Sequence, residues 1–198
     1  MDPKEPSMPH LARLLLDVYY LFDKHDLQPV VGGALAGNYY RTPRETIEID
    51  MNVNENGEDH RALQILEREL GVEISAHHIE SAVSGAQSIG IELGYDVDLD
   101  LFFRFTREVS DFVVESSRIV KFAGKDVRIL SPECLLIMKA AFNRTKDWDD
   151  IEQIVRSTPV DLNNLQVFAD LVMGMEEELY RIKSLVLKAR QLDGKLAF

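Results

Sequence analysis

The stretch VVGGALAGNYYRTPRETIEIDMNV, residues 30–53, contains the pattern that decides the fold. A short apolar run of two valines leads into Gly32 and Gly33. Because glycine has no Cβ, this pair lets the backbone turn sharply and lie close to a ligand. The small residues at 34–36 suit a helix whose first N–H groups and positive dipole end would face the turn. We therefore predict a strand, a tight turn and a helix that together can hold an anion.

Polar and apolar residues alternate over residues 46–51, which is typical of a half-buried strand. Side chains two apart on a strand lie on the same face, so Glu48 and Asp50 point the same way. Two neighbouring carboxylates repel each other unless a cation or a proton lies between them. A phosphate cradle beside such a pair is what metal-dependent phosphoryl or nucleotidyl transfer requires. The alternative is an ordinary buried turn next to solvated acids on an edge strand.

A second acidic run has the same alternation. Asp96, Asp98 and Asp100 fall on one face of the segment at 95–103, with apolar residues between them. Aspartate is depleted in strands, and three in alternating positions repel one another, which indicates a compensating cation. A solvated edge strand is the alternative here as well.

Composition limits the classes of function. The chain has 198 residues, of which 45% are hydrophobic and 28% charged, as in one ordinary globular domain. The net charge of −12 disfavours a broad nucleic-acid surface, because phosphate contacts need lysine and arginine. Cys134 is the single cysteine, so no intramolecular disulfide forms. The sequence has no signal core and no membrane-spanning run, so we expect a cytoplasmic protein.

The rest of the chain predicts an α/β (α+β) fold, a mixed sheet flanked by helices with a helical segment at the C-terminal end. We divide it into an α/β core, residues 1–130, and a helical part, residues 131–198, that packs on the core and completes the site. Helices are expected over residues 9–25, 60–70, 134–142, 146–156 and, in two segments, 161–192. Strands are expected near residues 72–75, 88–93 and 95–103, and in a hairpin of 112–122 with 126–130.

The helical part carries its own candidate residues. Ser131 is expected to cap a helix in which Pro132 takes the first position. Lys139 is the single lysine of that apolar helix, so it either reaches solvent or meets an anion. Asp147 lies one turn from Asp150 in the next helix, which Thr145 is expected to cap; dipole-favoured acids at a helix start are the alternative explanation.

Together these motifs resemble the nucleotidyltransferase superfamily, which has the polymerase-β-like fold. Arg44-x-Thr46-x-Glu48-x-Asp50 is similar to its Arg-x-Thr-x-Asp-x-Asp motif, with Glu48 in place of the first aspartate. The resemblance is greatest to the AbiEii-like nucleotidyltransferases, which include toxins of bacterial toxin–antitoxin systems. The segments that match their later motifs, in order, are Ser131-Pro132-Glu133-Cys134-Leu135, Lys139, and Arg144-Thr145-Lys146-Asp147-Trp148-Asp149-Asp150.

The resemblance implies a role for each matched residue. Gly32, Gly33, Arg44, Thr46, Lys139 and Arg144 would bind the nucleotide. Mg²⁺ or Mn²⁺ would be held by Glu48, Asp50 and Asp100, with Asp98 as the alternative third carboxylate. The residues implied in catalysis are Asp50, Asp100, Lys139 and Asp147.

The implied reaction transfers a nucleoside monophosphate from an NTP to a hydroxyl acceptor on RNA, protein or a small molecule. An antitoxin is the partner that the toxin branch implies. Glu48 reaches one methylene further than aspartate, and Mg²⁺ demands near-octahedral geometry. The competing hypothesis is therefore a catalytically inactive nucleotide-binding or partner-binding protein on the same fold.

Overall fold

The computed structural model describes residues 8–193. It contains a central sheet with helices on both sides and two short turns of 3₁₀ and π type. The helices are α1 Met8–Lys24, α2 Gly33–Gly37, α3 Arg61–Ile65, α4 Ala76–Val83, α5 Arg107–Ser116, α6 Pro132–Phe142, α7 Thr145–Ser157, α8 Leu162–Val172 and α9 Glu176–Asp193. The turns are η1 Gly57–Asp59 (3₁₀) and η2 Leu66–Leu70 (π). The strands are β1 Val30–Val31, β2 Glu48–Asn52, β3 Ser88–Gly94, β4 Val97–Phe102, β5 Arg118–Phe122 and β6 Lys125–Ile129.

The six strands form one mixed sheet in the order β3-β4-β2-β1-β6-β5. β2 runs parallel to β4, and β1 runs parallel to β6, whereas the other neighbours are antiparallel. The central pair β2 and β4 aligns Glu48 with Asp98 and Asp50 with Asp100. The two acidic runs predicted from the sequence therefore lie side by side in the middle of the sheet.

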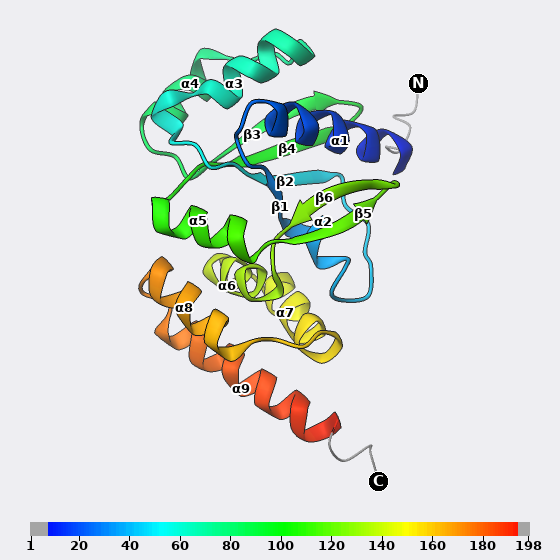
Figure 1. The fold of residues 1–198 in the computed structure, drawn as a ribbon, viewed down its shortest axis with the longest axis vertical. Helices are drawn as coiled ribbons and strands as arrows, with labels where there is room; N and C mark the ends of the chain where they lie inside the picture. Colours follow the sequence, from blue (N-terminus) through cyan, green and yellow to red (C-terminus); the bar gives the residue numbers. More distant parts are fainter. Residues whose placement is uncertain (1–7, 194–198) are drawn as a thin grey trace.

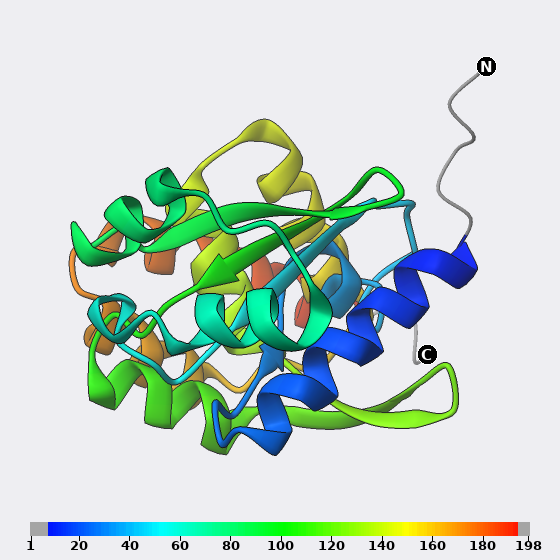
Figure 2. The same cartoon turned by 90° about the horizontal axis from the view of Figure 1, so that it is seen from above.

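Helices cover the two faces of this sheet unequally. In Figure 1, α1 and α3 lie above the sheet, while α5 and the helices from α6 to α9 lie below it. Figure 2, seen from above, shows α1 and α3 in front of the strands and the red and orange C-terminal helices behind them. The short helix α2 contacts both β2 and α6. The turn before α2 is thus close to the helical part of the chain.

One continuous hydrophobic core joins these layers. The apolar residues between the acids of β2 and β4, such as Ile49 and Leu99, are fully buried. Leu15 and Phe22 of α1 are fully buried in the same core. Alternation in the strands thus sends one set of side chains into the core and the acids to the opposite face. In residues 8–193, no helix is both long and apolar enough to cross a membrane.

Three local predictions were wrong. No strand forms over residues 72–75, because Ser75 begins α4 with a capping box that involves His78. Residues 112–116 belong to α5 instead of a hairpin strand, because the Thr106 side chain accepts a hydrogen bond from Val109 N and so starts a helix. Thr145 is the first residue of α7, and the residue before it takes the cap position without a side-chain bond.

Candidate functional site

The Gly-Gly turn lies in direct contact with Asp50. Gly32 N donates to Asp50 O at 2.8 Å, which links the turn to β2. The Asp50 side chain accepts a hydrogen bond from the backbone N–H of Ala34. Gly33 has a φ of +52°, and a Cβ on it would lie 1.7 Å from Asp50 Oδ2. Glycine is therefore required here for two reasons, the left-handed backbone and the close approach of a carboxylate.

The four acids of β2 and β4 form a row whose charges are incompletely balanced. Burial, then Asp100 and Glu48, raise the pKa of Asp50 to about 6, while Lys139 and the Ala34 N–H act in the opposite direction. Burial, followed by Glu48 and Asp98, also raises the pKa of Asp100. The row of carboxylates therefore has the oxygen donors and the excess negative charge that suit a hard divalent cation.

The chemistry of these donors fits Mg²⁺ or Mn²⁺, but their present arrangement is not a finished metal site. Among residues 8–193, no three carboxylate, imidazole or thiolate side chains converge closely enough to hold a metal ion. The Asp50 carboxylate interacts with the backbone N–H of Ala34 as well as with its acidic neighbours Asp100 and Glu48.

Lys139 meets anions rather than solvent. Its side chain is only 7% exposed, and Nζ lies 2.7 Å from Asp150 Oδ2 and 3.8 Å from Asp147 Oδ1. The two aspartates come from consecutive turns of α7, as the spacing predicted. Of the two choices that the sequence left open for this lysine, the structure therefore selects the anion.

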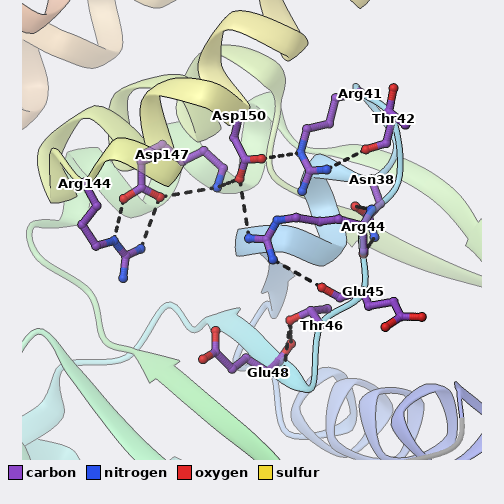
Figure 3. Close-up of polar contacts among 11 residues, drawn as sticks. Asn38, Arg41, Thr42, Arg44, Glu45, Thr46, Glu48, Arg144, Asp147 and Asp150 are labelled. Carbon is purple, nitrogen blue, oxygen red and sulfur yellow. Dashed lines mark hydrogen bonds and ion pairs between the residues drawn. The ribbon is translucent and has the colours of Figure 1, made fainter.

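Asp150 also binds the segment that follows α2. Arg41 Nε lies 2.9 Å from Asp150 Oδ1, as an ion pair whose N–H is not aligned well enough for a hydrogen bond. The buried Nη2 of Arg41 has no hydrogen-bond partner among the described residues. Arg44 Nη2 lies 3.6 Å from Asp150 Oδ2. Figure 3 shows Arg41 and Arg44 reaching Asp150 from one side, while Arg144 holds Asp147 on the other.

Arg144 and Thr46 have mainly local partners. Arg144 binds both oxygens of Asp147, with Nε 2.6 Å from Oδ2 and Nη2 3.2 Å from Oδ1. This pairing raises the pKa of Arg144 above its ordinary value. The Thr46 hydroxyl accepts from Glu48 N at 3.2 Å, at the start of β2 (Figure 3).

A cleft of about 360 Å³ opens beside this network. Of the residues predicted from the sequence, it brings together Gly32, Gly33, Asp50, Lys139, Arg144 and Asp147. Arg44, Thr46, Glu48, Asp98 and Asp100 are not part of its lining, although Glu48 and Asp100 influence the charge of Asp50. The cleft continues away from the charged residues between the ends of β2 and β4 and the helices α5, α6 and α8.

Sequence reasoning missed two parts of this site. Arg41 was not singled out, because a lone arginine after a helix has no distinguishing pattern. Asp150 was noted for sharing a face with Asp147 and for ending the matched motif from Arg144, but it was not given a role in the site. Phe105 and Phe142 of the cleft lining are half exposed, at 51% and 52%, and no sequence motif marked them.

Comparisons with known proteins agree with this architecture at the level of the fold. No protein-family model matches the sequence, and no curated protein matches it significantly. An antigenic nucleotidyltransferase-like protein from Paracoccidioides brasiliensis superposes with a TM-score of 0.56 at 15% identity, covering 89% of this chain and 93% of that one. The antibiotic-resistance factor ANT(2″)-Ia superposes with a TM-score of 0.50 at 18% identity, covering 94% of each chain. The chain therefore has a nucleotidyltransferase-like fold, with a mixed six-stranded sheet and C-terminal helices.

We expect the Asp150→Asn variant to lose about 3 kcal/mol of unfolding free energy, because Arg41 would remain buried without a compensating charge and Lys139 would keep only the longer contact to Asp147. Asp149→Asn is the matched control, since Asp149 is the exposed neighbour on the same helix, and its change should stay within about 0.5 kcal/mol. Urea titration of both variants measures the difference. Equal losses would contradict a stabilising role for the buried network.

The raised pKa of Asp50 predicts a pH dependence in metal-free buffer with a chelator. Between the ordinary pKa of about 3.9 and the native pKa of about 6, the native state holds a proton that the unfolded state has lost. The free energy of unfolding therefore falls as pH rises through this window, by at most about 3 kcal/mol from this group. Asp50→Asn lacks this titration, so its stability relative to the parent protein should increase between pH 4 and pH 7. A constant difference would refute the shift.

The close approach at Gly33 gives a third prediction. Gly33→Ala and Gly71→Ala both place alanine at positive φ, which costs about 1–2 kcal/mol in each case. Nothing lies within 4 Å of a Cβ at Gly71, whereas Gly33→Ala must also displace the Asp50 carboxylate. Thermal unfolding should show the larger loss for Gly33→Ala. A similar loss in both variants would mean that the Asp50 side chain moves aside freely.

Proposed function

We propose that the chain is a divalent-metal-dependent nucleotidyltransferase that moves a nucleoside monophosphate from an NTP to a hydroxyl acceptor. The observation that carries this proposal is the row of paired acids on β2 and β4, which lies beside the Gly-Gly turn on a nucleotidyltransferase-like fold. The nearby cleft also contains the buried Lys139. Phosphates and divalent cations both require such a combination of backbone N–H groups, carboxylates and a lysine.

Each group has a part in this proposal. The turn at Gly32 and Gly33 approaches the phosphates, with Lys139 and Arg144 supplying positive charge from the helical wall of the cleft. Asp50 and Asp100, with Glu48 and with Asp98 as the alternative third carboxylate, would hold the metal. Bound there, Mg²⁺ or Mn²⁺ would neutralise phosphate charge and polarise the α-phosphate. The acceptor hydroxyl attacks the α-phosphorus and gives its proton to a carboxylate of the acid row or to water, while the bond from the α-phosphorus to the bridging oxygen breaks and pyrophosphate leaves.

Asp147 and Arg44 have supporting roles in the same proposal. Asp147 holds Arg144 and faces Lys139, so it orients both cations toward the cleft. Arg44 is 43% exposed at its side chain and lies close to Asp150, from where it can reach a phosphate at the edge of the site. Thr46 fixes the start of β2 and thereby the position of Glu48. We assign residues 131–198 to the completion of the site, since Lys139, Arg144 and Asp147 come from this part.

Membership of the AbiEii-like branch is also a proposal, and it rests on the order of the motifs from Ser131 to Asp150. A toxin role with an antitoxin partner follows from that resemblance alone, and a cytoplasmic location is proposed from the sequence, in which we found neither a signal core nor a membrane-spanning run. A second candidate function is nucleotide or partner binding without turnover. It is favoured by Glu48 in place of aspartate and by the bond that Asp50 makes to Ala34 N.

Label transfer from each of the four α-³²P NTPs tests the proposed function. The purified chain is incubated with Mg²⁺ and with total cell RNA, cell protein or a small-molecule extract as the acceptor. We expect label in one acceptor fraction, and loss of that label in Asp50→Asn. Asp96→Asn is the matched control, because Asp96 is exposed in the β3–β4 turn at positive φ, which asparagine tolerates.

The outcomes separate the two candidate functions. Transfer that needs Asp50 but not Asp96 supports the enzyme and identifies the acceptor class. NTP binding without transfer, measured by calorimetry, favours the non-catalytic candidate, and Glu48→Asp then tests whether the longer side chain prevents turnover. If neither binding nor transfer occurs, the nucleotide assignment itself is wrong.

A further inference from the structure

The cleft has two chemically different halves. Its charged half contains Asp50, Lys139, Arg144 and Asp147, which are the only charged residues in the described lining. The other half, here named the ring subsite, is lined by uncharged side chains from the ends of β2 and β4 and from α5, α6 and α8. Its principal aromatic residues are Phe102, Phe103, Phe105, Phe142 and Phe168.

Aromatic rings line the path from one half to the other. The guanidinium of Arg144 lies 4.9 Å from the centre of the Phe142 ring, which places Phe142 at the junction of the two halves. Phe102 meets Phe142 edge to face, with ring centres 6.4 Å apart. Phe105 and Phe142 remain half exposed although both line the cleft. Exposed rings at the wall of a cavity are suited to cover a flat partner.

The ring subsite also contains carboxamides. Gln28, Asn52, Asn54 and Gln87 line it. Asn54 Nδ2 donates to Gln28 Oε1 at 2.7 Å, whereas the buried Oδ1 of Asn54 has no hydrogen-bond partner in the described structure. The carboxamide of Asn54 is therefore held by Gln28 through its Nδ2 while its own oxygen stays buried. Carboxamides beside apolar walls recognise the polar edges of uncharged rings.

We propose that the ring subsite binds a flat, uncharged ring with hydrogen-bonding atoms on its edge. This inference rests on the proposed function, because the phosphates of the same ligand or of its co-substrate would occupy the charged half. The ring comes either from the base of the NTP or from the body of the hydroxyl acceptor. A polycation or a nucleic-acid backbone does not fit, since the subsite offers neither carboxylates nor basic side chains.

Four probes separate the contributions of ring and phosphate: tripolyphosphate, the four NTPs, the four nucleosides and 2-naphthol. Binding is measured by calorimetry with Mg²⁺ for the parent chain, Phe105→Leu and Phe142→Leu. Both residues are half exposed, so leucine preserves apolar character and removes only the ring. Phe122→Leu is the matched control, because Phe122 lies on β5 outside the cleft. A fifth variant, Asn54→Leu, removes the carboxamide.

If the base occupies the subsite, loss of either ring should weaken NTP and nucleoside binding about tenfold. Tripolyphosphate binding should stay unchanged in Phe105→Leu, whereas Phe142→Leu also removes the ring beside Arg144 and is compared through the nucleosides. Asn54→Leu should then reduce the differences among the four nucleosides. If the acceptor occupies it, the same variants should weaken 2-naphthol binding about tenfold and leave NTP binding unchanged. Either pattern supports the ring subsite, provided that Phe122→Leu changes nothing.

The proposal is overturned if no ring probe loses affinity in Phe105→Leu or Phe142→Leu, or if no ring probe binds. Failure of the proposed function is a different result. In that case tripolyphosphate does not bind and no label is transferred, while the nucleosides or 2-naphthol still bind and still depend on Phe105 and Phe142.

Discussion

The buried carboxylate of Asp150 is the contact on which the candidate site depends. It pairs with Lys139 of α6 and with Arg41 of the segment between α2 and β2. This segment also leads into the strand that carries Glu48 and Asp50. One side chain therefore fixes the position of the helical wall relative to the acidic strands. Because buried charges are stable only when paired, the arrangement of α6 and α7 over the Gly-Gly turn is tightly constrained.

Negative and positive side chains form two separate sets around this contact. Burial of Asp50, together with repulsion from Asp100 and Glu48, raises the pKa of Asp50 to about 6. Across the cleft, Lys139 and Arg144 are held by aspartates of α7 and so keep fixed positions. The region between the two sets is consequently polar and preorganised, which is the condition for electrostatic stabilisation of a developing charge. Beyond Phe142 the lining carries no charge, so the cleft itself separates polar from apolar parts of a ligand.

The sequence predicted the fold class and the acidic row because both depend on local periodicity. Alternation in β2 and β4 determines which side chains share a face, and the parallel register then brings Asp50 opposite Asp100. The Val72–Ser75 strand and the extended start of the hairpin were wrong because side-chain caps at Ser75 and Thr106 started helices there. Arg41 and Phe142 could not be predicted as site residues, because their importance arises only from contacts between segments distant in sequence.

The position of Asp50 connects the two candidate functions. Its carboxylate satisfies the N–H of Ala34 at the turn where phosphate is expected to lie. If a cation and a phosphate bind together, the phosphate would accept the Ala34 N–H and the cation would bind the Asp50 carboxylate. Both groups would then have a new partner. Either partner alone leaves one group unsatisfied, so the two should bind cooperatively. In the proposed enzyme, the longer side chain of Glu48 would determine whether the acid row can close around the cation, and that geometry would separate turnover from binding.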